Sequence, residues 1–160
     1  MPWLKFPDPD DTISDWLKSL YDPYRLALVD PSVLPTPDKI DWDFYWAGTH
    51  TTSFIVVEDN TQHVFRALGP QTIDFNSDLI VHVAHRWIKA GKPPILKEFR
   101  EFLTKTLHAN LAPLPTVLTN AGITYMLPVS SRIHQVTTSA MEDFWVFEIR
   151  ILVKQTNQIV

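Results

Sequence analysis

Three carboxylates on predicted strands are the side chains in this sequence that could do chemistry. Asp74, Asp78 and Glu148 lie in or beside segments with the alternating or β-branched pattern of strands. Converging carboxylates can act as general acid and general base. The triplet 148–150 has the Glu-x-Lys spacing found in some nucleases, but it carries arginine in place of the lysine, and no well-placed Pro-Asp precedes it. A small hydrolase or nuclease that uses these three residues is therefore the alternative function.

The remaining chemical patterns are incomplete. His82 and His85 are three positions apart on a predicted strand, where side chains point to opposite faces and cannot bind one metal ion. The run Asp8-Pro9-Asp10-Asp11 lacks the glycine and the distal glutamate of a calcium loop, so we interpret it as the start of a helix. Serines 130, 131 and 139 lie in no Gly-x-Ser-x-Gly motif, and no glycine-rich phosphate loop occurs. We predict no catalytic residue, no metal site and no cofactor.

Composition and charge narrow the class of protein. The 160 residues include no cysteine, 13 prolines and 4 glycines, with a formal net charge of −4. The absence of cysteine excludes disulfides and thiolate chemistry, and no apolar run reaches the ~20 residues of a membrane-spanning helix. Residues 1–45 carry nine aspartates against four basic residues, which disfavours an N-terminal nucleic-acid arm. The loose basic stretch 86–105 is interpreted as a solvated face. We therefore expect a soluble domain with no membrane partner and no specific nucleic-acid contact.

The first 46 residues are predicted to form an acidic, aromatic- and proline-rich arm. They contain nine of the 19 aromatic residues, which is more than disordered segments usually hold. A short helix is predicted to begin at Thr12 and to end at Asp22-Pro23, followed by an extended path through the later prolines. Such an arm must lie on its own body or on a neighbouring subunit, and we expect it to pack largely on other chains. The predicted subunit-interface residues are Trp3, Phe6, Trp16, Tyr21, Tyr24, Trp42, Phe44 and Trp46.

Residues 47–160 are predicted to form an α+β domain, with a mainly antiparallel β-sheet packed against one long amphipathic helix. The helix should follow Pro93-Pro94 and extend to about Ala109, because the segment has an apolar stripe at helical spacing. The predicted strands are 42–46, 53–58, 63–68, 78–88, 122–127, 132–136 and 144–153. The strand 42–46 is a candidate for pairing across subunits.

The order of these elements resembles the small α/β proteins of tailed-virus necks, the tail-terminator and tail-completion families. The segments that carry the resemblance are Ser53–Val57, Leu79–Val83, Ile95–Leu107 and Phe144–Val153, within about two-thirds of the chain. The resemblance implies a non-enzymatic virion protein, assembled in the host cytoplasm, that forms a homo-oligomeric ring, a hexamer in the family. The ring would terminate or join the tail tube beside neighbouring neck proteins.

Simple observations distinguish the alternatives. An enzyme should have a concave pocket with converging carboxylates or histidines in the single chain. An assembly protein should have aromatic side chains that are exposed when its neighbours are removed. A cellular adaptor with the same arm-and-sheet plan is a third possibility, which differs from the assembly protein in its partner.

Overall fold

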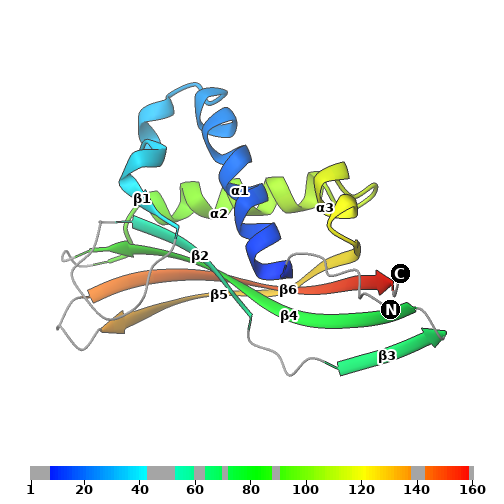
Figure 1. Cartoon of the computed structure of the whole chain (residues 1–160). Helices are drawn as coiled ribbons and strands as arrows, with labels where there is room; N and C mark the ends of the chain where they lie inside the picture. Colours follow the sequence, from blue (N-terminus) through cyan, green and yellow to red (C-terminus); the bar gives the residue numbers. More distant parts are fainter. Residues whose placement is uncertain are drawn as a thin grey trace.

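The computed structural model describes residues 8–42, 53–59, 64–69, 72–87, 91–137 and 143–158. They form an α+β fold in which helices cover one face of a mainly antiparallel sheet (Figure 1). The helices are α1 (Pro9–Leu26), α2 (Ile95–Ala109) and α3 (Thr116–Asn120), with short 3-10 turns η1 (Pro31–Val33) and η2 (Pro37–Lys39). The strands are β1 (Ile40–Asp41), β2 (Ser53–Asp59), β3 (Val64–Gly69), β4 (Thr72–Arg86), β5 (Ile123–Thr137) and β6 (Asp143–Gln158).

The sheet is built around two long central strands. Its order is β1-β2-β4-β6-β5, and every neighbouring pair from β2 to β5 is antiparallel. The short β1 pairs with β2 in parallel, and β3 pairs with the first part of β4. The predicted antiparallel sheet is therefore confirmed.

Alternation along β4 and β6 separates the two faces of the sheet as predicted. Leu79, Val81 and Val83 of β4 are fully buried in the main core. From β6, Phe147, Ile149, Ile151 and Val153 lie in the same core. Residues at the alternate positions, among them His82 and Glu148, lie on the face that carries none of the described helices, which we call the open face. Part of this face is a second buried cluster of Ala84, Phe144 and Val146. The apolar stripe of α2, which begins and ends where predicted, completes the helix-covered side.

Helix α1 is longer than the sequence indicated, and it corrects two predicted boundaries. It begins at Pro9 with Asp8 as the N-cap residue, and the Thr12 hydroxyl donates to the Asp8 carbonyl at 3.1 Å from inside the first turn. Proline at the first helical position has its φ pre-set for the helix, so the start precedes Thr12. At the other end the helix continues through Pro23 to Leu26. Burial of the face that includes Trp16 and Tyr21 outweighs the roughly 3 kcal/mol cost of an internal proline.

Residues 8–42 pack on the chain's own body, which corrects the prediction of an extended arm held by other chains. Trp16, Tyr21 and Trp42 are 4%, 0% and 8% exposed and belong to the main core. Tyr24 is partly buried, with its ring centroid 5.1 Å from that of Phe102 on α2. With 18 residues, α1 is also longer than α2, so the described helical layer is not the single long helix that the sequence predicted. The other predicted interface residues, Trp3, Phe6, Phe44 and Trp46, lie outside the described residues, as does most of the predicted strand 42–46.

Three strands differ clearly from their predicted extents. β6 continues to Gln158, five positions past its predicted end. β4 begins six positions earlier than expected, at Thr72. The segments predicted as separate strands on either side of 128–131 form the single strand β5, with an irregularity in register between Pro128 and Ser130. Proline lacks an N–H, but an edge strand needs only one of its two sides for pairing, so Pro128 is accommodated at a bulge.

Candidate functional site

The open face carries a belt of charged side chains across its middle. We call this the charged belt, and it consists of Glu58, Asp78, His82, Arg132, His134, Glu148 and Arg150. Strand register assembles it, because His82 pairs with Glu148 across β4 and β6, and Glu148 pairs with Arg132 across β6 and β5. Directly opposed residues on one sheet face are close enough to interact. The belt therefore joins four strands through side chains.

Glu148 is the centre of the belt. Its carboxylate accepts a hydrogen bond from Nε of Arg132 at 2.8 Å. The same carboxylate lies 3.2 Å from Nδ1 of His82 and 3.3 Å from Nε2 of His134. Burial by itself raises the pKa of Glu148, but the Arg132 hydrogen bond and the charges of His82, His134 and Arg132 outweigh it, so the net pKa is lowered. Glu148 is thus an ionised structural partner near neutral pH and is poorly suited to act as a general acid.

Two further pairs complete the belt. Nε2 of His82 lies 2.8 Å from Glu58, so its ring stands between two carboxylates. Arg150 donates from Nε to both oxygens of Asp78, at 2.7 and 2.8 Å, and this carboxylate raises the pKa of the guanidinium. These contacts neutralise much of the charge on the open face.

A hollow of about 340 Å³ lies beside the belt. It is lined by Ile80, Ser130, Ser131, Arg132, Glu148 and Arg150. Of the three carboxylates singled out from the sequence, Glu148 alone lines it. Asp78 is on the same face but is held by Arg150, and the side chain of Asp74 lies outside the described residues. Among the described side chains, the Asp78 and Glu148 carboxylates are therefore each bound by an arginine, and they do not line the hollow together.

The two histidines of β4 point to opposite faces, as predicted. His82 joins the charged belt on the open face. His85 is 8% exposed, and its Nδ1 lies 2.7 Å from Oγ of Ser53. The two rings therefore have separate partners and do not form a metal pair.

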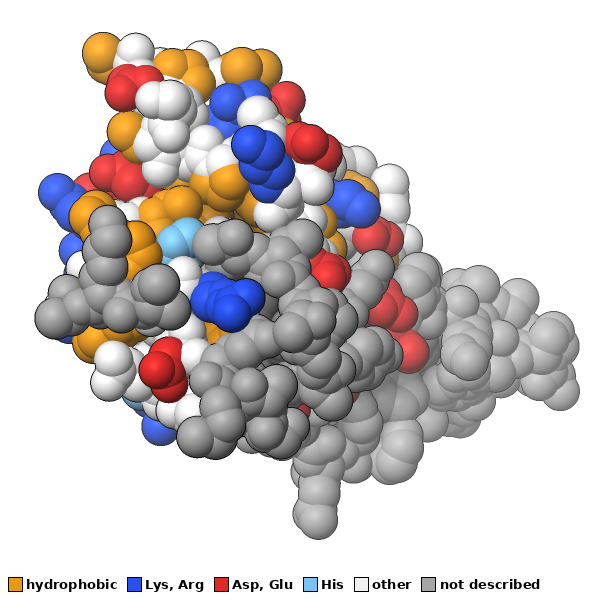
Figure 2. All heavy atoms as spheres, turned by 90° about the vertical axis from the view of Figure 1, so that its left-hand side faces the viewer, with side chains coloured by type: hydrophobic (Ala, Val, Ile, Leu, Met, Phe, Trp, Pro, Cys, Tyr) orange, Lys and Arg blue, Asp and Glu red, His pale blue; other side chains and the backbone are white. Residues whose placement is uncertain are grey.

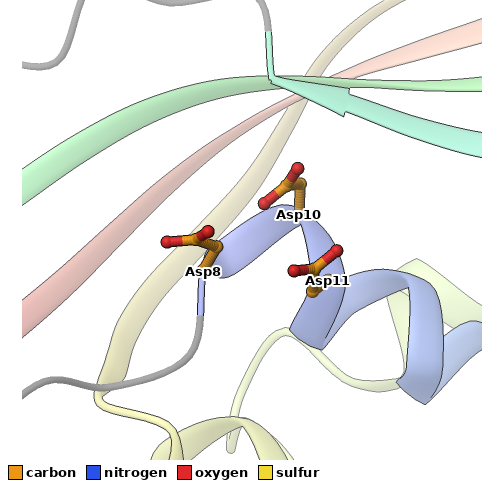
Figure 3. A group of neighbouring side chains, drawn as sticks. All are labelled: Asp8, Asp10 and Asp11. Carbon is orange, nitrogen blue, oxygen red and sulfur yellow. The ribbon is translucent and has the colours of Figure 1, made fainter.

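The acidic run Asp8-Pro9-Asp10-Asp11 forms a cluster at the start of α1 (Figure 3). One oxygen from each aspartate lies within 4.8 Å of the others. Burial is the main cause of the raised pKa of Asp10, and the negative charges of Asp11 and Asp59 add to it. The run occupies the N-cap and first turn of α1, as its interpretation as a helix start requires, although the helix begins three residues before the predicted Thr12. Carboxylates there stabilise the unpaired N–H groups of the first turn.

Strand β5 is the edge of the sheet, which the sequence did not reveal. It is 15 residues long, and among the described strands it pairs with β6 alone. In the first half of β5, the side chains of Tyr125, Leu127 and Val129 are 47%, 38% and 43% exposed. Leu152 of β6, which pairs with Leu127, is 36% exposed. We call these four residues the edge patch. The available signal was Pro128, because proline inside a strand is typical of an edge.

Charged side chains of both signs occur on the face that Figure 2 shows, which is the end of the molecule at the left of Figure 1. On the part of the surface that Figure 2 shows, Lys and Arg side chains are interspersed with Asp and Glu side chains rather than gathered by sign. Nucleic-acid binding faces usually concentrate basic residues.

Removal of the central carboxylate should lower stability in a pH-dependent way. We expect Glu148→Gln to cost about 1–3 kcal/mol of unfolding free energy at pH 7, below the value for a fully buried pair because Arg132 is 69% exposed. The pKa of Glu148 is lower in the folded chain than its ordinary value of 4.5 in the unfolded chain. The stabilisation that Glu148 gives the folded state is therefore fully present above pH 4.5, and it is lost as the pH falls through the folded-state pKa. Urea unfolding of both chains at several pH values checks this. Glu101→Gln, which removes an exposed pair with Lys105, should change stability by at most about 0.5 kcal/mol.

His85 should produce a separate acid-sensitive contribution. Burial lowers the pKa of this histidine below its ordinary 6.5, so the folded state holds it neutral. As the pH falls below 6.5, His85 binds a proton in the unfolded chain but stays neutral in the folded chain. The free energy of unfolding therefore declines until the pH falls below the folded-state pKa of His85. We expect His85→Gln to show a smaller loss of unfolding free energy between pH 7.5 and pH 5 than the unchanged chain. An identical loss in both proteins would contradict this assignment.

Comparison with known proteins identifies no family for this chain. The chain matches no protein-family model and no curated protein. Among the described helices, none is both long enough and apolar enough to cross a membrane.

Proposed function

We propose that this chain is a structural subunit of a tailed virus, which forms a homo-oligomeric ring at the neck or tail end and terminates or joins the tail tube. The element order that suggested the resemblance is present: β2 and β3, the long β4, the amphipathic α2, and the long final β6. By the resemblance, the ring is a hexamer in the virion that contacts the tail tube and neighbouring neck proteins. The subunit acts without catalytic residues or a cofactor.

The observation that carries this proposal is the edge strand β5. Long exposed edges expose unpaired N–H and C=O groups, and monomeric proteins usually shorten, charge or cover them. Here the strand is 15 residues long. It carries Pro128 and an irregularity between Pro128 and Ser130, but Tyr125, Leu127 and Val129 on it are exposed apolar side chains, with Leu152 of β6 beside them. Such an edge favours addition of another strand, which uses main-chain hydrogen bonds for affinity. The proposal therefore rests on β5 and not on the N-terminal segment, whose described aromatic residues serve the chain's own core.

The mass of the purified full chain tests the proposal. Native mass spectrometry and light scattering over a range of concentrations should give an oligomer of defined size, and negative-stain images should show rings. A chain that stays monomeric at every concentration contradicts the proposal.

The hollow beside Glu148 favours a hydrolase or nuclease as the second candidate. Two arginines and a carboxylate line it, with two serine hydroxyls at its wall. Against this candidate, Glu148 and Asp78 are both held by arginine. Turnover of phosphodiester and ester substrates that is lost in Glu148→Gln, with no change in oligomeric state, would favour the enzyme over the ring subunit.

A further inference from the structure

The hollow beside the charged belt brings two arginines together on the open face. Arg150 of β6 pairs with Ser130 of β5, and Glu148 pairs with Arg132 in the same way. Arg132 is therefore the diagonal neighbour of Arg150 on one face of the sheet, a separation that long side chains can span. Both arginines line the hollow of about 340 Å³ together with Ser130 and Ser131.

Each arginine is bound by a carboxylate along only part of its guanidinium group. Asp78 accepts hydrogen bonds from Nε and Nη2 of Arg150, and Glu148 accepts one from Nε of Arg132. Among the described residues, no acceptor is bound to Nη1 of Arg150 or to either Nη atom of Arg132. Because a guanidinium group is planar and rigid, a carboxylate that fixes one side of it also orients the remaining N–H donors.

The charges around the hollow favour an anion. Two of its described lining residues, Arg132 and Arg150, are basic, and one, Glu148, is acidic. The Glu148 carboxylate is also shared with His82 and His134, whose ring nitrogens lie 3.2 and 3.3 Å from it. Like charges on neighbouring strands are destabilising, so an anion between the two arginines would relieve their repulsion.

The donors at the hollow match a phosphate group. Ser130 and Ser131 are exposed, and each adds a hydroxyl to the Nη donors of the two arginines. A phosphate group presents three strong acceptor oxygens, and arginine binds it through paired, charge-assisted hydrogen bonds. Ile80 adds an apolar wall. The volume is that of a small-molecule site, for which roughly 300–1,000 Å³ is typical.

We infer that this hollow binds the phosphate group of a small molecule, between the guanidinium groups of Arg132 and Arg150 and beside the hydroxyls of Ser130 and Ser131. A nucleic-acid strand fits less well, because its further phosphates would pass the carboxylates of the same face. The inference goes beyond the proposed ring and does not depend on it, since the hollow lies within one chain.

Calorimetric titration of the full chain with inorganic phosphate tests the inference. The ionic strength is held constant by replacing chloride, so that general screening does not change. We expect saturable binding with a Kd of about 1 mM or tighter. A heat of mixing that does not saturate would overturn the inference.

Paired substitutions locate the binding without changing the net charge of the chain. Asp78→Asn with Arg150→Gln should raise the Kd for phosphate at least about tenfold, because charge-assisted hydrogen bonds are lost. The matched control is Asp22→Asn with Arg25→Gln, which removes the 2.9 Å ion pair on α1. This control should leave the Kd within about twofold, since distant sites act independently. Equal weakening by both pairs would mean adventitious binding only and would overturn the inference.

Two further measurements cover a folding defect and the source of the phosphate. Ser130→Ala with Ser131→Ala leaves both arginine–carboxylate pairs in place and should raise the Kd about threefold or more. An unchanged Kd in this variant would overturn the placement beside the serines. A short single-stranded oligonucleotide that displaces inorganic phosphate at a lower concentration of phosphate groups would overturn the assignment to a small molecule. A monomeric chain that binds phosphate as expected would contradict the ring and leave this inference standing.

Discussion

A chain with lysine at both Leu127 and Val129 should remain folded and should fail to assemble. These side chains are 38% and 43% exposed on the edge strand, so docking of another strand would bury apolar area at both positions. Lysine on an edge opposes strand addition because its charge would have to be desolvated. We expect the concentration at half-assembly to rise at least about 100-fold, since each tenfold step corresponds to ~1.4 kcal/mol. Light scattering over a dilution series measures this change.

A matched variant separates the edge patch from general surface hydrophobicity. Leu26 and Val29, near the end of α1, are exposed apolar residues at 60% and 107% and lie on no strand. Leu26→Lys with Val29→Lys should leave the assembly midpoint within about threefold of its original value, because no sheet edge is altered. If this control dissociates the oligomer and the β5 variant does not, the contact lies on the helical side and the edge-strand argument is wrong.

Tyr21→Ala should be among the most destabilising single changes in the chain, at about 3–5 kcal/mol of unfolding free energy. Tyr21 is fully buried, and burial raises the pKa of its hydroxyl. Its ring packs edge-on against Phe102 at 5.4 Å and against Trp42 at 6.1 Å between centroids. Its hydroxyl donates to the carbonyl of Pro35 at 2.6 Å. The Tyr21 side chain therefore connects α1 with α2 and with the segment that follows η1.

Tyr21→Phe isolates the hydrogen bond from the ring. This variant keeps the aromatic packing and leaves the Pro35 carbonyl without its donor, so we expect a loss of about 1–2 kcal/mol. Urea unfolding measured on the monomer, with the Leu127→Lys/Val129→Lys background if needed, gives both values. A loss below about 1 kcal/mol for Tyr21→Ala would mean that residues 8–42 do not stabilise the single chain, and would restore the original expectation that they pack on neighbours.

Local pattern was sufficient for the parts of the fold whose periodicity is complete in a short stretch. Alternation in 79–83 and 147–153 predicted which face of the sheet is buried, and helical spacing predicted α2 with its boundaries. The prediction is wrong for α1, because proline rules end the helix at Pro23, whereas burial of a whole helix face extends it to Leu26. The prediction is also wrong at β5, because Pro128 suggests a break between two strands but lies within one strand, with an irregularity in register beside it.

The candidate site depended on information that no short window contains. Glu148 was recognised as a strand carboxylate, yet its role follows from Arg132, which is 16 positions away, and the role of Asp78 follows from Arg150, which is 72 positions away. These pairs exist because antiparallel register aligns β4, β6 and β5. A shift of one residue would have put every side chain of a strand on the other face.

The sequence by itself determined the class of fold, the buried faces of β4, β6 and α2, and the absence of thiol chemistry, because these depend on residue type and local spacing. The tertiary structure alone decided that residues 8–42 cover the sheet of their own chain, that β5 is an edge, and that the open-face carboxylates are held by arginines and histidines. Those outcomes depend on which distant segments bury each other's apolar surface. Burial of apolar area is a non-directional effect, so a local pattern shows that a face is buried but does not show which segment covers it.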